Sequence, residues 1–141
     1  MKHILEQTVY YADTDSYGVV WHGTYLRWME MARVEMCREL GLDLNELKSN
    51  DIVIPVTNIN IRYKASAKID ERIYVETTIS KMTPFTFVFT QFIKNKETEK
   101  IYTQAEVEVV AVNTSGRIYR KMPEVLVSAC KKAMNEVVCQ G

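Results

Sequence analysis

The chain has 141 residues, of which 47% are apolar and 26% are charged. This balance is typical of one soluble globular domain and excludes a disordered or collagen-like chain. The 18 basic and 18 acidic residues cancel, so the sequence lacks the basic excess that a general nucleic-acid-binding protein usually shows. We therefore expect residues 1–141 to form a single domain that does not bind nucleic acid.

Hydrophobic periodicity predicts a strand over residues 4–12 and a long helix over residues 23–40. The strand segment ends at an Asp-Thr-Asp turn. In the helix, apolar residues recur three and four positions apart, and Gly41 suits the position just after the last turn. The face predicted to be buried carries Tyr25, Trp28, Met29, Ala32, Met36 and Leu40.

Four further segments show the alternation of a strand with one buried face. They are residues 52–65, 72–82, 85–94 and 100–113. Short links between them suit antiparallel neighbours. Residues 123–138 are predicted as a closing helix, because Pro123 and Glu124 favour a first helical turn. This order of elements predicts an α+β fold in which one sheet packs over the apolar long helix.

The cysteines and histidines give no sign of a disulfide framework or a metal site. Cys37, Cys130 and Cys139 form no CxxC pair and cannot all pair with one another, which suggests reduced thiols in a cytoplasmic protein. Cys37 falls in the helical pattern and is interpreted as a core residue. His3 and His22 show no metal-ligand spacing. The chain has no signal-peptide-like apolar stretch at its start, and no segment reaches the roughly 18 apolar residues of a membrane span.

Two stretches resemble a known family. The first is DTDSYGVVWHGTYL at residues 13–26, and the second is RYKASAKIDERIYVET at residues 62–77. Together, in this strand-helix-strand order, they resemble the hotdog-fold acyl-CoA thioesterases of the 4-hydroxybenzoyl-CoA thioesterase family. The resemblance covers roughly residues 5–125. It implies a hotdog fold, in which a curved antiparallel sheet wraps around a long central helix and a C-terminal helix follows.

The first stretch suits thioester hydrolysis on chemical grounds as well. That reaction needs a carboxylate or another base near the carbonyl carbon and hydrogen-bond donors for the developing oxyanion. The start of a helix supplies free N–H groups and the positive end of the helix dipole. A carboxylate some seven residues earlier can face these donors if the apolar run folds the loop back, and Gly18 permits the turn.

From the residues alone, Asp13 and Asp15 suit turn or capping positions as well as catalysis. The resemblance implies that Asp15 is the catalytic carboxylate, either as a nucleophile or as a general base for water, and that Asp13 is structural. His22 matches the position whose backbone N–H polarises the thioester carbonyl, with Gly23 beside it. Whether the His22 imidazole also takes part is left open. Tyr25 matches an aromatic position that shapes the substrate pocket.

Three basic residues are expected to bind the phosphates of coenzyme A, namely Arg62, Lys64 and Lys68. The alternative is that they form a solvated strand end. The chain also departs from the family pattern at two places. Tyr17 adds bulk near the acyl pocket where small residues or proline are frequent, so we expect it to contact substrate. Ser66 stands where proline is common, which predicts a looser turn.

The resulting prediction is an acyl-CoA thioesterase that cleaves a small or medium acyl thioester to free acid and thiol, with no metal or separate cofactor. Hotdog domains similar to this one work as homodimers or as homotetramers built from dimers, with the active site at the subunit interface. Pairing would also cover exposed edge strands. The leaving thiol is either coenzyme A or the pantetheine of an acyl carrier protein. The acyl group stays open, because Phe85, Phe87, Phe89 and Tyr17 suit an aromatic ring or a fatty chain equally.

Two alternative functions remain. The first is a hotdog hydratase or dehydratase, which depends on a histidine together with an acid on the central helix. Glu30 and Glu35 lie in the predicted helix without such a histidine, which counts against this alternative. The second is a non-catalytic module that binds acyl thioesters, which would have no need of Asp15.

Overall fold

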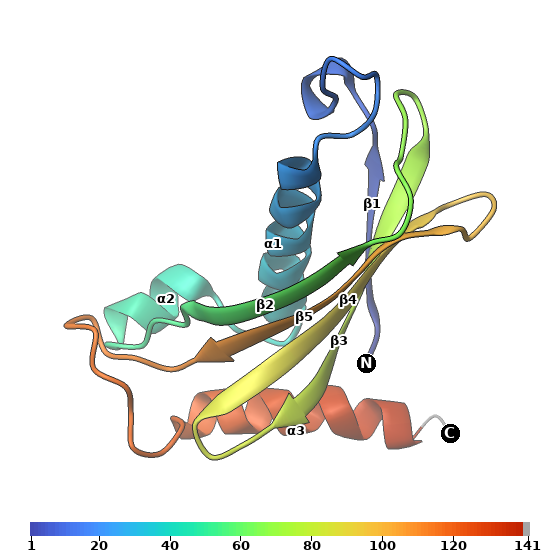
Figure 1. Cartoon of the computed structure of the whole chain (residues 1–141). Helices are drawn as coiled ribbons and strands as arrows, with labels where there is room; N and C mark the ends of the chain where they lie inside the picture. Colours follow the sequence, from blue (N-terminus) through green and yellow to red (C-terminus); the bar gives the residue numbers. More distant parts are fainter. Residues whose placement is uncertain (140–141) are drawn as a thin grey trace.

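A five-stranded antiparallel sheet curves around helix α1 in the computed structural model, which describes residues 1–139 and the side chains of residues 1–135 (Figure 1). The strands are β1 (His3–Thr8), β2 (Val56–Tyr63), β3 (Arg72–Met82), β4 (Thr86–Asn95) and β5 (Ile101–Val110). The helices are the 3-10 turn η1 (Tyr11–Asp13), α1 (His22–Glu39), α2 (Leu44–Ser49) and α3 (Glu124–Cys139). The predicted α+β architecture is confirmed.

The sheet has the order β1-β3-β4-β5-β2, which corrects one prediction from the sequence. The strands β2 and β3 follow each other in the chain but are not neighbours, because β2 pairs with β5 and β1 lies beside β3. The predicted antiparallel neighbours are confirmed for β3 with β4 and for β4 with β5. The two edges of the sheet are therefore β1 and β2.

Local hydrogen bonds explain two further differences from the prediction. The first strand ends at Thr8 rather than at residue 12, because the Asp13 carboxylate accepts a bond of 2.9 Å from the Tyr10 amide and residues 11–13 form a 3-10 turn. The sequence pattern did not predict α2, a short helix whose first amides are capped by the Asp43 carboxylate.

Helix α1 is buried because its apolar stripe faces the concave side of the sheet, as its spacing predicts. Its buried residues are Thr24, Tyr25, Trp28, Met29, Ala32, Met36 and Cys37. Burial alternates along β4, so every second side chain of this central strand faces the helix. The edge strand β2 is different, since nearly all of its residues are exposed.

Two apolar clusters fill the space between α1 and the sheet. One surrounds the first half of α1, and the other surrounds its second half together with α2 and α3. Gln91, which is fully buried, crosses from the sheet to the helix. Its Nε2 donates to the Met29 carbonyl at 2.9 Å and to Thr77 Oγ1 at 3.0 Å. A buried amide with satisfied donors fixes the helix on the strands, because moving it would leave polar groups unpaired.

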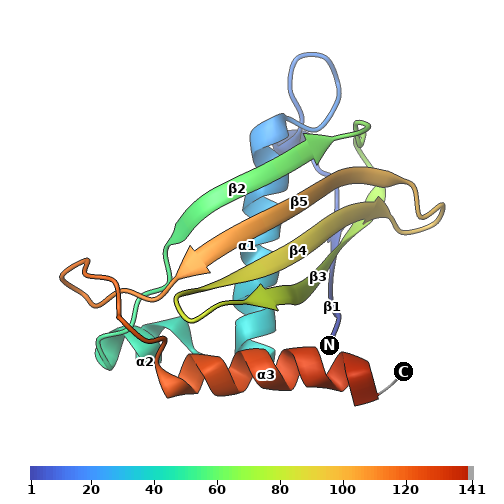
Figure 2. The ribbon, with the colours of Figure 1, turned by 60° about the horizontal axis from the view of Figure 1, so that its bottom comes forward.

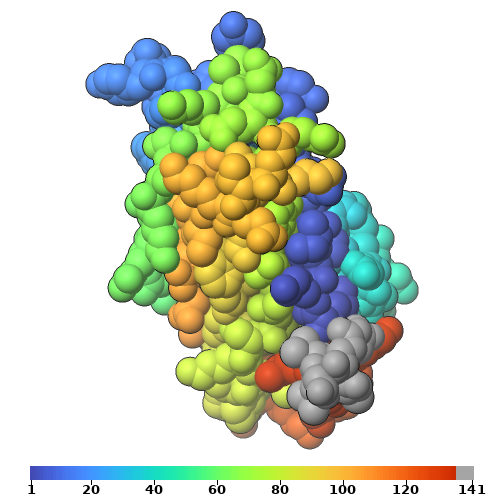
Figure 3. Space-filling view, turned by 90° about the vertical axis from the view of Figure 1, so that its right-hand side faces the viewer, coloured from blue at the N-terminus to red at the C-terminus, as the bar shows by residue number. Residues whose placement is uncertain are grey.

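Helix α3 crosses the end of the sheet beside the last turn of α1 (Figure 2). Its own residues Leu126, Ala129 and Cys130 are buried, and its Ala133 carbonyl accepts a bond of 2.6 Å from the Met1 ammonium. The N-terminal residues lie between the sheet and the helical side of the molecule (Figure 3). None of the helices described here is long and apolar enough to cross a membrane.

The two cysteines with described side chains are core residues. Burial raises the pKa of the Cys37 thiol to about 11 and that of the Cys130 thiol to about 12. Thiolate is therefore scarce at neutral pH, and the interpretation of Cys37 as a core residue is confirmed. The side chain of Cys139 lies outside the described part of the chain. Within that part, no group of three or more His, Cys, Asp or Glu residues is arranged to hold a metal ion.

Tyr102 joins a hydrogen-bond network at the end of the sheet nearest the start of α1. Its hydroxyl donates to Glu71 Oε2 at 2.6 Å and accepts from Asn95 Nδ2 at 3.0 Å. Burial and the Glu71 carboxylate raise the pKa of Tyr102 to about 12. The hydroxyl thus stays protonated in the folded chain to a higher pH than in the unfolded chain.

Replacing Tyr102 with phenylalanine is expected to lower the free energy of unfolding by roughly 1–3 kcal/mol, because Glu71 and Asn95 lose a buried partner. In the wild type this contribution is present below about pH 10 and is lost as the pH rises through the folded pKa. Urea unfolding at neutral and alkaline pH should show a steeper alkaline loss of stability in the wild type than in Tyr102→Phe. Parallel pH profiles for the two proteins would contradict this role.

Candidate active site

The loop between η1 and α1 folds back on itself, as the sequence analysis required. The Asp13 carbonyl accepts hydrogen bonds from the Trp21 amide at 2.9 Å and from Thr24 Oγ1 at 3.1 Å, which closes the base of the loop. Asp13 is only 4% exposed, and its carboxylate caps the Tyr10 amide. Both the backbone and the side chain of Asp13 therefore hold the loop in place.

Asp15 lies beyond this closure, in a tight turn. Its amide donates to the Val19 carbonyl at 2.9 Å, and its carbonyl accepts from the Gly18 amide at 3.0 Å. Gly18 has a φ of 78°, in the left-handed region that favours glycine. One carboxylate oxygen of Asp15 accepts a bond of 2.8 Å from the Tyr17 amide. The other oxygen accepts no hydrogen bond from any described residue, so it is available to a ligand.

The first turn of α1 supplies donors at the other end of the same loop. The Thr24 amide donates to the Trp21 carbonyl at 2.9 Å, whereas the amides of His22 and Gly23 have no acceptor in the described chain. These two amides lie at the positive end of an 18-residue helix. A Cβ at Gly23 would lie 2.3 Å from the Trp21 ring, so the indole packs directly over this glycine.

The His22 side chain is exposed and lies among aromatic rings. Its ring centroid is 5.1 Å from that of Trp21 and 6.3 Å from that of Tyr63, which meets it edge-on. The Tyr63 hydroxyl donates to the His22 carbonyl at 3.3 Å. Tyr63 is thus a site residue that the sequence analysis did not single out, although it belongs to the second matched stretch.

The link between β2 and β3 lies against this loop, so the two matched stretches meet at one end of the molecule (Figures 1 and 3). The Val20 amide donates to the Ala67 carbonyl at 2.9 Å, and Val19 forms a β-bridge with Lys68. The Ala67 amide in turn donates to the Tyr25 hydroxyl at 2.9 Å. Tyr25 is 3% exposed, so it supports the link from within the core.

The basic residues expected at a coenzyme A site divide into two groups. Lys64 and Lys68 lie exposed in the link beside the loop. Arg62 pairs with Gln104 in the β2–β5 register, on the face of the sheet turned away from α1. The β-bridge to Val19 therefore places Lys68 at the loop, whereas Arg62 lies on the far face of the sheet. Tyr17 is 88% exposed at the tip of the loop.

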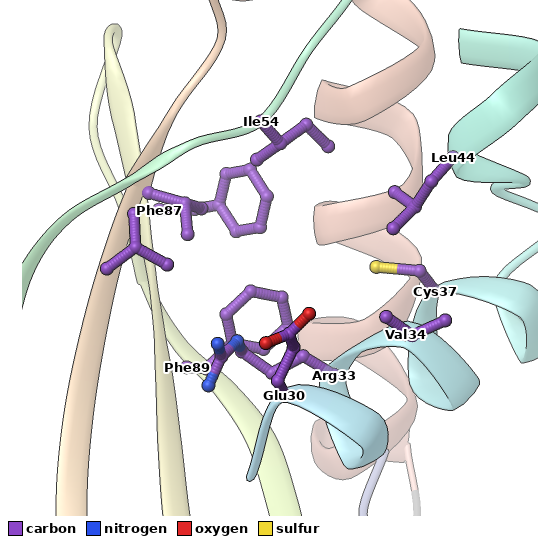
Figure 4. A pocket seen from close by; sticks show the side chains of 10 residues that line it. Glu30, Arg33, Val34, Cys37, Leu44, Ile54, Phe87 and Phe89 are labelled. Carbon is purple, nitrogen blue, oxygen red and sulfur yellow. The ribbon is translucent and has the colours of Figure 1, made fainter. Parts of the chain in front are cut away.

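A cavity of about 320 Å³ lies further along α1, between this helix, the end of α2 nearest to it and the sheet (Figure 4). Its apolar walls include Phe87 and Phe89, whose rings are 5.4 Å apart. Phe85 does not line it, since this residue precedes β4 and is 50% exposed. Two of the four aromatic residues that we expected in an acyl pocket thus line one cavity.

Residues 9–130 match the family model of the thioesterase-like superfamily. The chain belongs to this superfamily. The chain is similar to the acyl-CoA thioester hydrolase YbgC of Escherichia coli. The two sequences are 35% identical over 124 residues, which cover 88% of the chain and 92% of YbgC.

Solved structures of thioesterases share the fold of this superfamily member. A probable thioesterase from Bartonella henselae is 30% identical, with a TM-score of 0.80 over 87% of the chain and 100% of that structure. A 1,4-dihydroxy-2-naphthoyl-CoA thioesterase from Synechocystis is 23% identical, with a TM-score of 0.84 over 92% of the chain and 96% of that structure, and it shows the fold alone. The hotdog fold is confirmed, with an open sheet.

Proposed function

We propose that the chain hydrolyses acyl-CoA thioesters at the loop that joins η1 to α1. The observation that carries this proposal is that one unoccupied Asp15 carboxylate oxygen and two unoccupied amides lie on the same loop, which is closed at its base. Family membership and the similarity to a named acyl-CoA thioester hydrolase support the same reaction. Measuring free thiol released from a panel of acyl-CoAs tests the proposal, and no turnover of any acyl-CoA would refute it.

In the proposed mechanism, the thioester carbonyl oxygen points at the amides of His22 and Gly23. These amides and the helix dipole stabilise the oxyanion as the tetrahedral intermediate forms. The free oxygen of Asp15 either attacks the carbonyl carbon or removes a proton from the attacking water. The Tyr17 amide holds the other oxygen, which orients the carboxylate. Collapse of the intermediate breaks the carbon–sulfur bond and expels the thiolate, which takes up a proton. On the water route this step also gives the free acid, whereas on the nucleophilic route it leaves an acyl–Asp15 anhydride that water then hydrolyses to the acid and the Asp15 carboxylate.

The His22 imidazole is exposed, so it can contact the thioester or the attacking water from the mouth of the site. Tyr63 orients it through the ring contact and through the bond to the His22 carbonyl. Lys64 and Lys68 are proposed to attract the phosphates of coenzyme A, because both lie exposed in the link that borders the loop. The same surface suits an acyl-carrier-protein thioester.

Replacing Gly23 with alanine is expected to lower kcat roughly tenfold or more, because the new methyl group displaces the Trp21 ring next to the two amides. Helix stability should not fall, since alanine is favoured over glycine in a helix by about 0.5–1 kcal/mol. Turnover, tryptophan fluorescence and thermal unfolding of the variant check this result. Unchanged turnover with a displaced ring would show that Trp21 and Gly23 do not shape the site.

The active protein is proposed to be a dimer, or a tetramer of such dimers, joined through β2. The two edges of the sheet differ in a way that supports this choice. Edge strand β1 carries an ion pair of 2.8 Å between Glu6 and Lys96, and charge of this kind blocks strand pairing. Edge strand β2 also has one charged residue, Arg62, but this residue forms no ion pair with any described side chain. Three large apolar side chains of β2 are exposed, Val56 and Ile59 to 40% and Tyr63 to 45%, against Ile4 at 45% on β1. Because Tyr63 touches His22, a second copy on β2 would border the site.

The alternative of a hotdog hydratase is disfavoured by the placement of acids on α1. Glu30 and Glu35 lie two or more turns beyond His22, and neither is hydrogen-bonded to it. The Nε2 atom of His3 lies 3.6 Å from Oε2 of Glu39, but this pair is at the opposite end of α1 from the loop. The alternative of a binding module without catalysis keeps the cavity and predicts no thiol release, so the same assay separates it from a hydrolase.

A further inference from the structure

The cavity beside α1 has apolar walls on most sides and a polar wall on the helix. Phe87, Phe89 and Ile54 face the cavity from the sheet and from the segment before β2. Arg33 and Glu30 bring a guanidinium and a carboxylate to it from α1 (Figure 4). Charged groups beside apolar walls suggest that the occupant has a polar part as well as an apolar part.

A buried side chain, rather than a carboxylate, holds the Arg33 guanidinium in place. Gln91 is fully buried, and its Oε1 accepts a bond of 2.9 Å from Arg33 Nη1. The amide nitrogen of Gln91 is fully used by the Met29 carbonyl and Thr77 Oγ1, so the amide cannot turn over. The position of the guanidinium is therefore built into the contact between α1, β3 and β4.

The guanidinium has more donors than the chain uses. Arginine carries five N–H groups, and the only hydrogen bond from Arg33 to a described side chain is the bond to Gln91. Arg33 also forms no ion pair with any described carboxylate. The side chain is only partly exposed, and this burial lowers the pKa of the guanidinium. An oxygen atom of a ligand would pair donors that are otherwise poorly satisfied.

Glu30 limits what kind of oxygen can bind there. Its carboxylate lines the same wall but lies beyond ion-pair distance from Arg33. A ligand carboxylate at Arg33 would be repelled by Glu30, whereas an uncharged oxygen would not. A hydroxyl group is favoured further, because it accepts from Arg33 and can also donate to a carboxylate.

We propose that Arg33 is a specificity-determining residue that binds an uncharged oxygen, such as a hydroxyl, near the far end of the acyl chain. This inference rests on the proposed thioesterase function. Residues 22 and 33 are separated by about 16 Å along a helix axis, and helical side chains point back toward the helix start. With carbon–carbon bonds of about 1.5 Å, a chain of about eight to ten carbons spans the distance from the His22 amide to the guanidinium.

The test compares decanoyl-CoA with its ω-hydroxy and ω-carboxy derivatives for the wild type, Arg33→Met and Arg38→Met. We expect the wild type to have a kcat/KM about tenfold or more higher for the ω-hydroxy substrate than for decanoyl-CoA. In Arg33→Met the ratio should fall to near one. The matched control, Arg38, is exposed on the same helix and pairs with Glu35, so Arg38→Met should keep the wild-type ratio. A ratio measured on one variant cancels any loss common to both substrates.

Several results would overturn the inference while leaving hydrolysis intact. They are equal kcat/KM values for the first two substrates in the wild type, a preference that survives Arg33→Met, and a preference for the ω-carboxy derivative. If no acyl-CoA is hydrolysed, the proposed function fails separately. Calorimetric Kd values for the same three ligands then decide whether Arg33 recognises the hydroxyl. Tighter binding of the ω-hydroxy ligand that Arg33→Met abolishes supports this role, and equal Kd values refute it.

Discussion

Replacing Asp15 with asparagine is expected to lower kcat for acyl-CoA hydrolysis by roughly 10²-fold or more, with little change in the thermal unfolding midpoint. The asparagine side chain keeps an oxygen that can accept the bond from the Tyr17 amide, so the turn persists. What is lost is the negative charge on the free oxygen, which the reaction needs as a nucleophile or base. Free-thiol release and thermal unfolding, measured on the same preparations, check both parts of this expectation.

Asp13 offers a matched control two positions away. Its carboxylate is buried, caps the Tyr10 amide at 2.9 Å and lies 3.5 Å from an Arg27 nitrogen. Asp13→Asn is therefore expected to lower the unfolding midpoint, and to reduce kcat per folded molecule far less than Asp15→Asn does. If instead Asp13→Asn abolishes turnover while Asp15→Asn leaves it intact, the two aspartates have been assigned the wrong way round.

The double replacement Asn58→Asp with Asn60→Asp is expected to raise the Kd of the β2-linked dimer by roughly tenfold or more. These residues lie opposite Glu108 and Glu106 of β5 on the edge strand. In a symmetric β2–β2 contact the new carboxylates would also face those of the second copy. Since Tyr63 of β2 touches the site, turnover should fall in parallel with the dimer fraction. Light scattering and enzyme assays across a protein dilution series measure both quantities.

The matched control for this experiment is Gln7→Asp on β1, the other edge of the sheet. It also replaces an amide with an acid, on an edge that the proposal leaves unpaired, so the Kd of the dimer should not change. Circular dichroism of both variants separates loss of the dimer from loss of the fold. A dimer that persists in the β2 variant but dissociates in Gln7→Asp would place the interface on β1.

The sequence by itself determined the elements whose pattern is set by local burial. The three-and-four spacing of α1 predicted its buried stripe, and alternation predicted β3 with its observed bounds, Arg72–Met82. The motifs at residues 13–26 and 62–77 together predicted the family and, through the resemblance, the fold, and the family match and the thioesterase structures confirm both. The helix and the strand were predictable because each residue's side of its own element follows from the period of that element, whereas the family and the hotdog fold followed from the resemblance of the motifs.

The tertiary structure alone decided which separated residues meet. Periodicity cannot show that β2 lies beside β5 rather than β3, because strand order depends on how distant segments pack. For the same reason, the sequence did not separate Arg62, on the outer face of the sheet, from Lys68, which forms a bridge with the loop, or pair Tyr63 with His22. The guanidinium of Arg33 faces a cavity only because a buried amide, 58 residues away in the sequence, fixes it there. Contacts at such separations follow from the packing of α1 on the sheet, which no local pattern encodes.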